Sequence, residues 1–286
     1  MTRRFLTYAL LILIGANLLA WQVVFNLSQP ANLEVSFLDV GQGDAVFINT
    51  SLNQQVLIDG GPDSLILLEK LGERMPVWDR TIDLVILTHP ERDHLTGLME
   101  VLKRYQVENI LWSGFDKGNE ETRAWIKLIS EEGAKIWIAK SRMKITAGRD
   151  VFKVIYPLQA SDVQKPGASA NNTSVVIRLT DGQIGFLFTG DIGKTPEKEI
   201  IASQQDIQAD ILKVSHHGSK TSSSEEFIKA VSPLVAIISV GKDNKYGLPS
   251  QEVLEMLAKS GIRVLRTDQD KDITITSDSF RWLIDD

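Results

Sequence analysis

The feature that most restricts the fold of this chain is an uncharged, apolar segment close to its N-terminus. No Asp, Glu, Lys or Arg occurs in residues 5–33, and residues 5–27 are mostly apolar. As an α-helix this stretch is roughly 30 Å long, which matches the hydrocarbon core of a bilayer. A surface helix of a globular protein would carry charged residues at regular intervals. We therefore expect one membrane-inserted helix at the N-terminus.

The charges around this segment predict its orientation. Arg3 and Arg4 precede it and no basic cluster follows it, so the positive-inside rule predicts a cytoplasmic N-terminus. The chain after Pro30 would then lie outside, as part of a single-pass protein of the cell membrane. The alternative is a cleaved signal peptide. We prefer the anchor, because residues 18–21 (LLAW) make a poor cleavage site and the apolar run is long for a signal core.

Composition excludes several classes of protein. The chain contains 31 Lys and Arg against 37 Asp and Glu, a net charge of −6, so a large basic nucleic-acid-binding face is ruled out. It contains no cysteine, which excludes disulfide frameworks, thiolate zinc sites and cysteine nucleophiles.

The rest of the chain, residues 31–286, is predicted to be one α/β domain behind an anchor and short linker at residues 1–30. Apolar runs between turn residues predict strands at residues 33–40, 45–48, 55–58, 82–87, 136–139, 151–156, 174–179, 184–188, 211–214, 235–240 and 273–276. Apolar residues at helical spacing predict helices around residues 98–105, 125–129 and 253–257. Residues 161–172 are expected to form the longest loop.

The four histidines of the chain occur in two short motifs, THPERDH (residues 88–94) and VSHHGS (residues 214–219). The first motif supplies four candidate metal ligands, His89, Glu91, Asp93 and His94. It follows a predicted strand and precedes a helix expected near Thr96, so a loop could direct all four toward one point. Imidazole and carboxylate together suit Zn, Mn or Fe. The alternative is a solvated loop with Asp93 as a helix cap.

Polar residues follow other predicted strands in the same way. Asp59 comes after VLI, Asp191 after FLFTG, and His216 after ILKVS. A single Asp after a strand is more often a turn former. Their joint occurrence favours a set of ligands along one rim of a sheet, around one or two metal ions.

Five motifs together resemble the metallo-β-lactamase superfamily. They are LDVGQGDA (38–45), LIDGG (57–61), THPERDH (88–94), FTGD (188–191) and LKVSHHGSKTSSSEEF (212–227). Within it, the chain is similar to the C-terminal domain of ComEC-type DNA-internalisation (competence) proteins over about residues 33–277. The HHGSKTS and GQGDA blocks are specific to that branch. The resemblance implies an α/β fold, an αββα sandwich preceded here by one transmembrane helix, with a dinuclear metal site at one edge.

The resemblance also implies a ligand set for two divalent ions, Zn or Mn. Its members are His89, Glu91, Asp93, His94, Asp191 and His216. Asp191 would bridge the ions, and Asp59 would orient a ligand. His216 is preferred over its neighbour His217 because it comes first after the strand. Only one of the two can be the ligand, and the other would contact substrate.

Three positions depart from the family pattern. Glu91 stands where His or Asp is common, which favours a harder ion such as Mn. Asn172 stands where many members place a histidine, so it would be a weak ligand. Leu248 stands where relatives commonly have a histidine, and leucine can neither donate a proton nor bind phosphate. If that histidine is a general acid, its loss costs about 10²- to 10⁴-fold in rate.

The preferred functional hypothesis is a metal-dependent hydrolase, a phosphodiesterase or nuclease that acts on DNA in competence-type uptake. Metal-bound water would be the nucleophile, with Asp93 and His217 as catalytic residues. Substrate phosphate would meet Ser219, Lys220, Thr221, Lys242 and Lys245. Residues 219–224 lead into a helix expected at Glu225, which suits anion binding. The alternative for this segment is a capping box of Ser223 with Glu226.

Two other functions are kept as alternatives. One is an envelope metallo-hydrolase of a small ester, amide or lactone, because the fold supports many chemistries. The other is a weakly catalytic module that binds DNA or a competence-pore partner, suggested by Leu248 and Asn172. The chain lacks the multi-helix channel of ComEC-type proteins, so transport would require a separate channel protein.

Overall fold

The computed structural model describes residues 2–28, 31–164 and 169–285. The chain divides into two compact units, Met1–Ala31 and Asn32–Asp286. Two expectations fall partly outside the described residues, namely the linker at residues 29–30 and the middle of the long loop at residues 165–168.

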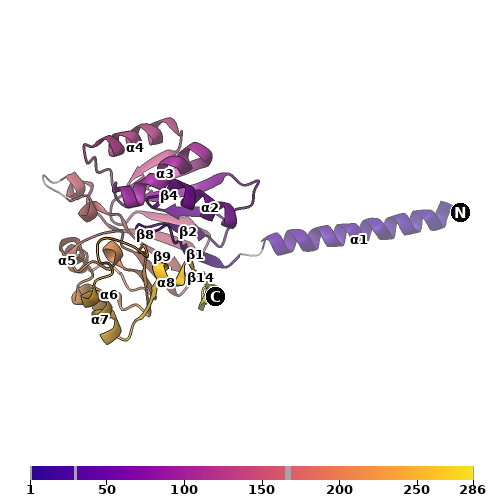
Figure 1. The fold of residues 1–286 in the computed structure, drawn as a ribbon. Helices are drawn as coiled ribbons and strands as arrows, with labels where there is room; N and C mark the ends of the chain where they lie inside the picture. Colours follow the sequence, from indigo (N-terminus) through magenta and orange to yellow (C-terminus); the bar gives the residue numbers. More distant parts are fainter. Residues whose placement is uncertain (1, 29–30, 165–168, 286) are drawn as a thin grey trace. The chain divides into compact units, whose positions relative to one another are not determined.

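The first unit is a single helix, α1 (Thr2–Ser28), shown in Figure 1. Within it, Arg4–Gln22 is long and apolar enough to cross a membrane, and none of this stretch is buried in the structure. Side chains such as Ile12 and Trp21 are more than two-thirds exposed. The apolar helix expected from the sequence is therefore present. A signal sequence has the same properties, so the choice between anchor and signal stays a prediction.

The second unit contains two β-sheets that pack face to face. The first sheet has the order β15-β14-β1-β2-β3-β4-β5-β6 and the second has the order β13-β12-β11-β10-β9-β8-β7. The first sheet consists of β1 (Leu33–Phe37), β2 (Val46–Asn49), β3 (Gln55–Ile58), β4 (Thr81–Leu87), β5 (Gln106–Trp112), β6 (Lys135–Ile138), β14 (Ile273–Ser277) and β15 (Trp282–Asp285). The second consists of β7 (Lys144–Ala147), β8 (Asp150–Tyr156), β9 (Val176–Asp181), β10 (Ile184–Phe188), β11 (Ile211–Lys213), β12 (Val235–Ile238) and β13 (Arg263–Arg266).

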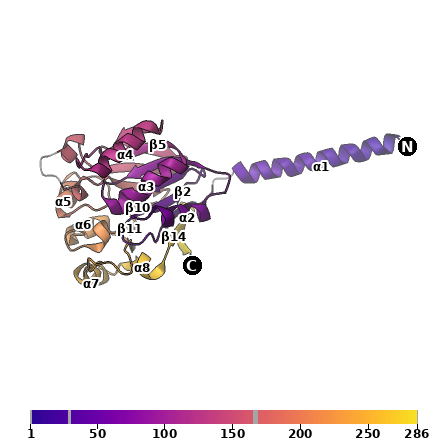
Figure 2. The ribbon, with the colours of Figure 1, turned by 45° about the horizontal axis from the view of Figure 1, so that its top comes forward.

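Helices cover the outer face of each sheet, as Figures 1 and 2 show. The helices α2 (Ser64–Arg74), α3 (Arg92–Arg104) and α4 (Glu120–Glu131) pack on the first sheet. The helices α5 (Lys194–Ala202), α6 (Glu225–Val231) and α7 (Gln251–Lys259) pack on the second. The short helix α8 (Thr267–Asp270) follows β13, and three 3₁₀ turns occupy Ala160–Gln164, Asn171–Thr173 and Ser215–Gly218. The predicted αββα sandwich is confirmed.

The alternation of side chains along each strand explains why the runs are apolar throughout. In β10, Phe186 and Phe188 point into the core between the sheets, whereas Leu187 packs under the helices of the second sheet. In β4, Ile86 faces the same central core and Val85 faces the helices of the first sheet. Successive side chains of a strand point to opposite faces. A strand that is buried on both faces therefore needs apolar residues at every position.

The start of α3 differs from the expectation. The helix begins at Arg92, and Glu91 is its N-cap residue, so Asp93 and His94 lie in its first turn rather than in a loop. The interpretation of Asp93 as the cap is therefore wrong. The apolar stripe of this helix begins only at Leu95. The first turn of α3 before Leu95 contains no apolar residue. The spacing of apolar residues therefore predicted a helix start that is too late in the sequence.

The first turn of α3 packs directly on the backbone after β3. The amide of Gly60 donates to the carbonyl of His94 at 2.7 Å, and the amide of Gly97 donates to the carbonyl of Gly61 at 3.1 Å. A Cβ atom on Gly97 would lie 1.9 Å from the carbonyl oxygen of Gly60 and 2.7 Å from Leu67. Glycine at position 97 thus permits the approach that places His94.

We expect Gly97→Ala to lower the free energy of unfolding by at least about 1–3 kcal/mol, because the new methyl group has no space. Gly72→Ala is the matched control. Gly72 also lies in a helix, α2, and a Cβ atom added there would have no other atom within 4 Å, so alanine should stabilise by up to about 1 kcal/mol. Guanidinium unfolding followed by tryptophan fluorescence measures both. Equal effects of the two substitutions would contradict this account of the packing.

Candidate metal centre

The candidate metal ligands gather at one end of the two sheets. His89 follows the end of β4, Asp191 follows β10, and His217 follows β11. β3 runs parallel to β4, and β10 runs parallel to β11, so the loops after these strands emerge at a common edge. The first turn of α3 adds Asp93 and His94.

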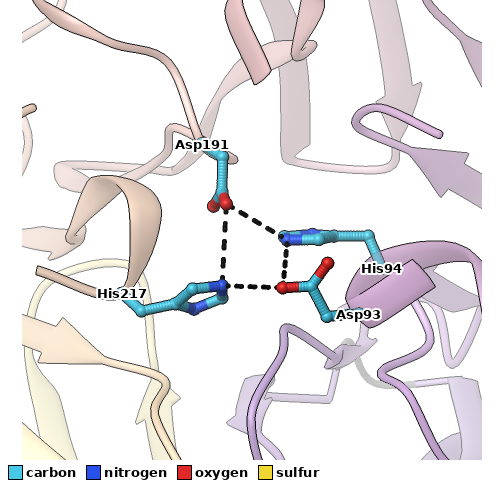
Figure 3. Close-up of side chains that lie close together, drawn as sticks. All are labelled: Asp93, His94, Asp191 and His217. Carbon is cyan, nitrogen blue, oxygen red and sulfur yellow. Dashed lines mark hydrogen bonds and ion pairs between the residues drawn. The ribbon is translucent and has the colours of Figure 1, made fainter. Parts of the chain in front are cut away.

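Four of these side chains form the tightest group, shown in Figure 3. The members are Asp93, His94, Asp191 and His217, whose ligand atoms all lie within 4.8 Å of one another. Nε2 of His94 is 3.4 Å from Oδ2 of Asp191, and Nε2 of His217 is 3.6 Å from the same oxygen. Nε2 of His217 is also 3.3 Å from Oδ2 of Asp93. The group therefore has the composition and spacing of a metal site.

The other ring nitrogen of His94 and of His217, Nδ1, makes a hydrogen bond to a residue outside the group. Nδ1 of His94 donates to Oδ2 of Asp59 at 2.8 Å, and Nδ1 of His217 donates to the carbonyl of Ser239 at 2.9 Å. Asp59 also accepts from the hydroxyl of Thr88 at 2.7 Å, and that hydroxyl lies 3.0 Å from Nδ1 of His89. Such partners fix the ring orientation of metal-binding histidines. Asp59 thus orients His94 directly and His89 through Thr88.

Several atoms that face the group have no hydrogen-bond partner among the described residues. They are Nε2 of His89, Nε2 of His94 and Oδ1 of Asp191, all of them buried. An unpaired buried polar atom costs about 1–3 kcal/mol. Nε2 of His89 and Nε2 of His94 both lie near Oδ2 of Asp191, whereas its Oδ1 lies 3.8 Å from Nζ of Lys213. Two unpaired imidazole nitrogens beside a carboxylate fit a divalent ion.

Asp191 lies at the centre of the histidines. Nε2 of His89 is 4.0 Å from its Oδ2 and Nε2 of His216 is 3.9 Å away, in addition to His94 and His217. Burial raises the pKa of the Asp191 carboxyl, but the charges of His217 and His94 outweigh it and hold that pKa well below its usual range. The carboxylate is therefore ionised, and the imidazoles of four histidines surround it within 4.0 Å of its Oδ2.

The structure does not bring every predicted ligand into the group. Both carboxylate oxygens of Glu91 lie 2.7 Å from Nζ of Lys117, so this side chain is turned to a surface ion pair. The sequence preferred His216 as a ligand, whereas the structure brings His217 into the group of four and leaves His216 beside it. Oδ1 of Asn172 accepts from the amide of Gly193 at 2.9 Å. This hydrogen bond joins the 3₁₀ turn before β9 to the residue before α5.

The two adjacent histidines reach the site through an uncommon backbone conformation. His216 has φ 51° and His217 has φ 52°, both in the left-handed region, which residues other than glycine rarely adopt. The turn is held by the hydroxyl of Ser222, which donates to the carbonyl of Ser215 at 3.0 Å. The hydroxyl of Ser215 donates to the carbonyl of Ile192 at 2.6 Å. Strain of this kind persists where the surroundings hold it, and it is concentrated at functional sites.

A buried ion pair under the group was missed by the sequence analysis. Nζ of Lys213 bonds the carboxylate of Asp44, donates to the carbonyl of Gly190 at 3.2 Å and lies 3.8 Å from Oδ1 of Asp191. Burial lowers the pKa of Lys213, but the carboxylates of Asp44 and Asp191 outweigh it and raise that pKa above its usual value. The lysine is therefore charged. The residue in the sequence that could have indicated this ion pair is Asp44, the aspartate of the GQGDA motif.

An open cavity of about 320 Å³ adjoins the metal group. It is lined by Asn171, Lys194, His216, Thr221 and Asp191, among others. Nδ2 of Asn171 is 3.3 Å from Nε2 of His216, and Oγ1 of Thr221 is 3.4 Å from its Nδ1. Asn171 and Lys194 were not predicted from the sequence.

The remaining predicted substrate residues are spread around this cavity. Ser219 bonds Thr221, with 2.9 Å between the hydroxyl oxygens, and Lys220 lines a neighbouring cavity of about 630 Å³ that also contains Lys194. Lys242 and Lys245 are exposed and line neither cavity. Leu248 is half-buried and packs against the core of the second sheet. The cap of α6 is Ser224, which accepts from the amide of Phe227, so the capping box at Ser223 is wrong.

Comparison with known proteins agrees with the fold. Residues 54–231 match the family described as "Beta-lactamase superfamily domain". Among solved structures, the metallo-beta-lactamase fold protein YhfI from Bacillus subtilis is similar with a TM-score of 0.57 and 13% identity, covering 86% of this chain and 100% of that one. CmlA, a diiron beta-hydroxylase from Streptomyces venezuelae, is similar with a TM-score of 0.55 and 13% identity, covering 86% and 54%.

Several curated relatives are competence proteins. "ComE operon protein 3" of Bacillus subtilis is 37% identical over 82% of this chain and 32% of its own length. "Competence protein ComA" of Neisseria gonorrhoeae is 30% identical over 82% and 31%, respectively. "Recombination protein 2" of Haemophilus influenzae is 31% identical over 85% and 29%. The chain spans about a third of the length of these relatives.

The family match covers more than half of the chain, and the two-sheet fold agrees with it. The chain therefore belongs to the metallo-β-lactamase superfamily and is related, within it, to the ComEC-type competence proteins.

Proposed function

We propose that this protein is a membrane-anchored, metal-dependent phosphodiesterase that cleaves DNA outside the membrane. The observation that carries the proposal is the group of Asp93, His94, Asp191 and His217, whose ligand atoms all lie within 4.8 Å of one another beside an open cavity. The superfamily is one of metal-dependent hydrolases, and the relatives are competence proteins. Nuclease activity, anchoring and DNA as substrate are the steps that we add.

The residues present would hold the ions unequally. Asp93, His94, Asp191 and His217 supply a full set of four ligands for one ion, and His89 with Asp191 supplies a partial set for another. Zn or Mn suits this mixture of imidazole and carboxylate. When bound, the ions lower the pKa of a water molecule and offset the charge on the phosphoryl oxygens.

The geometry supports separate roles for the residues around the cavity. The side chain of Asp93 is 34% exposed, against 3% for Asp191, so Asp93 is the carboxylate of the group that can contact and orient an attacking water. His217 is 2% exposed and its Nε2 faces Asp93 and Asp191, which suits a ligand better than the proton donor expected from the sequence. The side chain of His216 is 32% exposed and lines the cavity, so it is placed to contact a phosphate.

Positive charge at the cavity supports a phosphate ester over a neutral ester or lactone. Lys194 lines both cavities and opens helix α5, where backbone amides favour an anion. The second cavity is lined by Lys220, Lys229 and Lys259 but also by Glu225, Glu252 and Glu255. The positive charge that supports a phosphate ester is therefore that of Lys194 at the first cavity.

The relatives support a role in DNA uptake at the cell membrane. We propose that α1 spans the membrane with its N-terminus in the cytoplasm and that the domain lies outside. In this proposal a separate channel protein moves the DNA. The neutral-substrate hydrolase and the weakly catalytic binding module remain the alternatives that the experiments below distinguish.

Metal binding should depend on Asp191 and not on Glu91. We expect Asp191→Asn to weaken binding of zinc or manganese by at least about tenfold, because the central charge is lost. Glu91→Gln should leave the tightest ion unaffected, because Glu91 pairs with Lys117. Elemental analysis after dialysis against metal buffers measures both variants. A larger loss in Glu91→Gln than in Asp191→Asn would contradict the assignment.

Metal binding should also release protons. Burial lowers the pKa of His217, but Asp191 and Asp44 outweigh it and raise that pKa to about 10, so the ring is protonated at neutral pH and must lose its proton to bind an ion. Burial lowers the pKa of His89 to about 3, so this ring has none to lose. Affinity should therefore rise with pH towards 10. Calorimetry in buffers of different ionisation enthalpy measures how many protons are released when the metal binds. We expect His217→Ala to release one proton fewer than the unsubstituted protein and His89→Ala to release the same number. A loss of one proton in His89→Ala but not in His217→Ala would contradict these protonation states.

Cleavage of DNA tests the proposed reaction. The full chain with Mn or Zn should shorten a labelled single-stranded oligonucleotide, and Asp93→Ala should slow this by about 10²- to 10⁴-fold. Glu108→Ala, an exposed carboxylate in β5, is the control and should retain the rate. Activity that survives Asp93→Ala would point to a contaminant. Turnover of a lactone reporter alone would favour the neutral-substrate hydrolase, and DNA retention without product would favour the binding module.

A further inference from the structure

The strands give the domain two distinct ends. β4, β10 and β11 run toward the metal centre, which follows their last residues. β1 also ends on this side, because Leu38 leads into the GQGDA motif beside the centre. The opposite end is marked by the start of β1 at Leu33, which pairs with Ser277 at the end of β14. We call this opposite end the anchor end, because only residues 29–32 separate Leu33 from α1.

Several exposed apolar side chains lie at the anchor end. Phe280 in the β14–β15 turn is 72% exposed, Leu283 in β15 is 69% exposed, and Leu52 in the β2–β3 turn is 53% exposed. Val77 and Trp78, in the loop before β4, are 80% and 84% exposed. Large apolar side chains that the fold leaves in water are candidates for contact with a binding partner.

The turns that carry these residues are firmly held. The amide of Ser51 donates to Oδ2 of Asp150 at 2.6 Å, which joins the β2–β3 turn to the start of β8. Asp181 accepts from the hydroxyls of Ser277 and Ser279 at 2.7 and 2.9 Å, which joins the end of β9 to the β14–β15 turn. The two turns of the first sheet that carry Leu52 and Phe280 are therefore held by strands of the second sheet.

The length of the connection identifies the partner. Four residues span at most about 14 Å when fully extended, so Leu33 at the anchor end lies within that distance of the end of α1, and a membrane-spanning α1 would keep this end of the domain close to the bilayer surface. Aromatic residues are favoured there, because their rings pack against the acyl boundary. Arg281, which is exposed beside Phe280, adds a positive charge that headgroup phosphates can bind.

We propose that the anchor end of the domain, through Leu52, Phe280, Leu283, Val77 and Trp78, inserts into the interfacial layer of the same lipid bilayer that holds α1. This inference rests on the proposed membrane anchoring. A strand such as β4 has seven residues and spans about 23 Å, so the metal centre faces away from the membrane. The bilayer thus fixes the orientation of the catalytic end toward DNA arriving from outside.

The absence of cysteine from the chain makes a direct test possible. Phe280→Cys and Leu65→Cys each introduce a single labelling site in the full chain, and both native side chains are 72% exposed. Leu65 lies in the first turn of α2 after β3, at the end of the domain that carries the metal centre, so it is the matched control. Each variant is labelled with an environment-sensitive fluorophore and reconstituted in phosphatidylcholine–phosphatidylglycerol vesicles.

We expect the label at position 280 to emit at shorter wavelength and to be quenched several-fold more by nitroxide-bearing lipid than the label at position 65. Vesicle flotation is measured on the same samples. If the protein floats with the vesicles but both labels are quenched equally, the anchor end does not insert, although α1 still anchors the protein. Failure to float refutes the proposed anchoring, and the insertion with it.

Discussion

The structure depends on the burial of several carboxylates at one end of a β-sandwich. Asp44, Asp59 and Asp191 are each at most 3% exposed, and charges taken out of water cost several kcal/mol each unless opposite charge lies close by. Lys213 and the imidazoles of His94 and His217 provide part of that charge. Nε2 of His89 and Nε2 of His94 remain without a hydrogen-bond partner among the described residues, and a divalent cation would complete this balance.

The fold brings these groups together because the polar residues of the site follow directly after the apolar strands. Residues inside the strands are buried on both faces and form the three cores, while the polar residues begin where the strands end. Gly97 and Gly60 let α3 approach closely enough for His94 to meet Asp191. Lys213 is the last residue of β11, so one strand supplies both the buried cation and, four residues on, a metal-facing histidine.

Local signals in the sequence predicted the strands and most of the site residues, whereas the αββα sandwich was implied by the family resemblance. The bounds of β3 and β10 agree with the apolar runs, and His89, Asp93, His94 and Asp191 all reach the centre. What failed depended on backbone conformation or distant contacts. The left-handed φ of His216 and His217 decides which ring enters the group, and no spacing rule predicts it. Glu91 pairs with Lys117, which is 26 residues away in the sequence. Asp44 pairs with Lys213, which is 169 residues away.

The central claim is that Asp93, His94, Asp191 and His217 together hold a divalent ion. An anomalous difference map from crystals of the protein grown with zinc or manganese tests it most directly. The account predicts a peak about 2.0–2.2 Å from Nε2 of both histidines and from oxygens of both aspartates. A map without a peak at this group, or with the ion bound only at the surface beside Glu91 and Lys117, would contradict it.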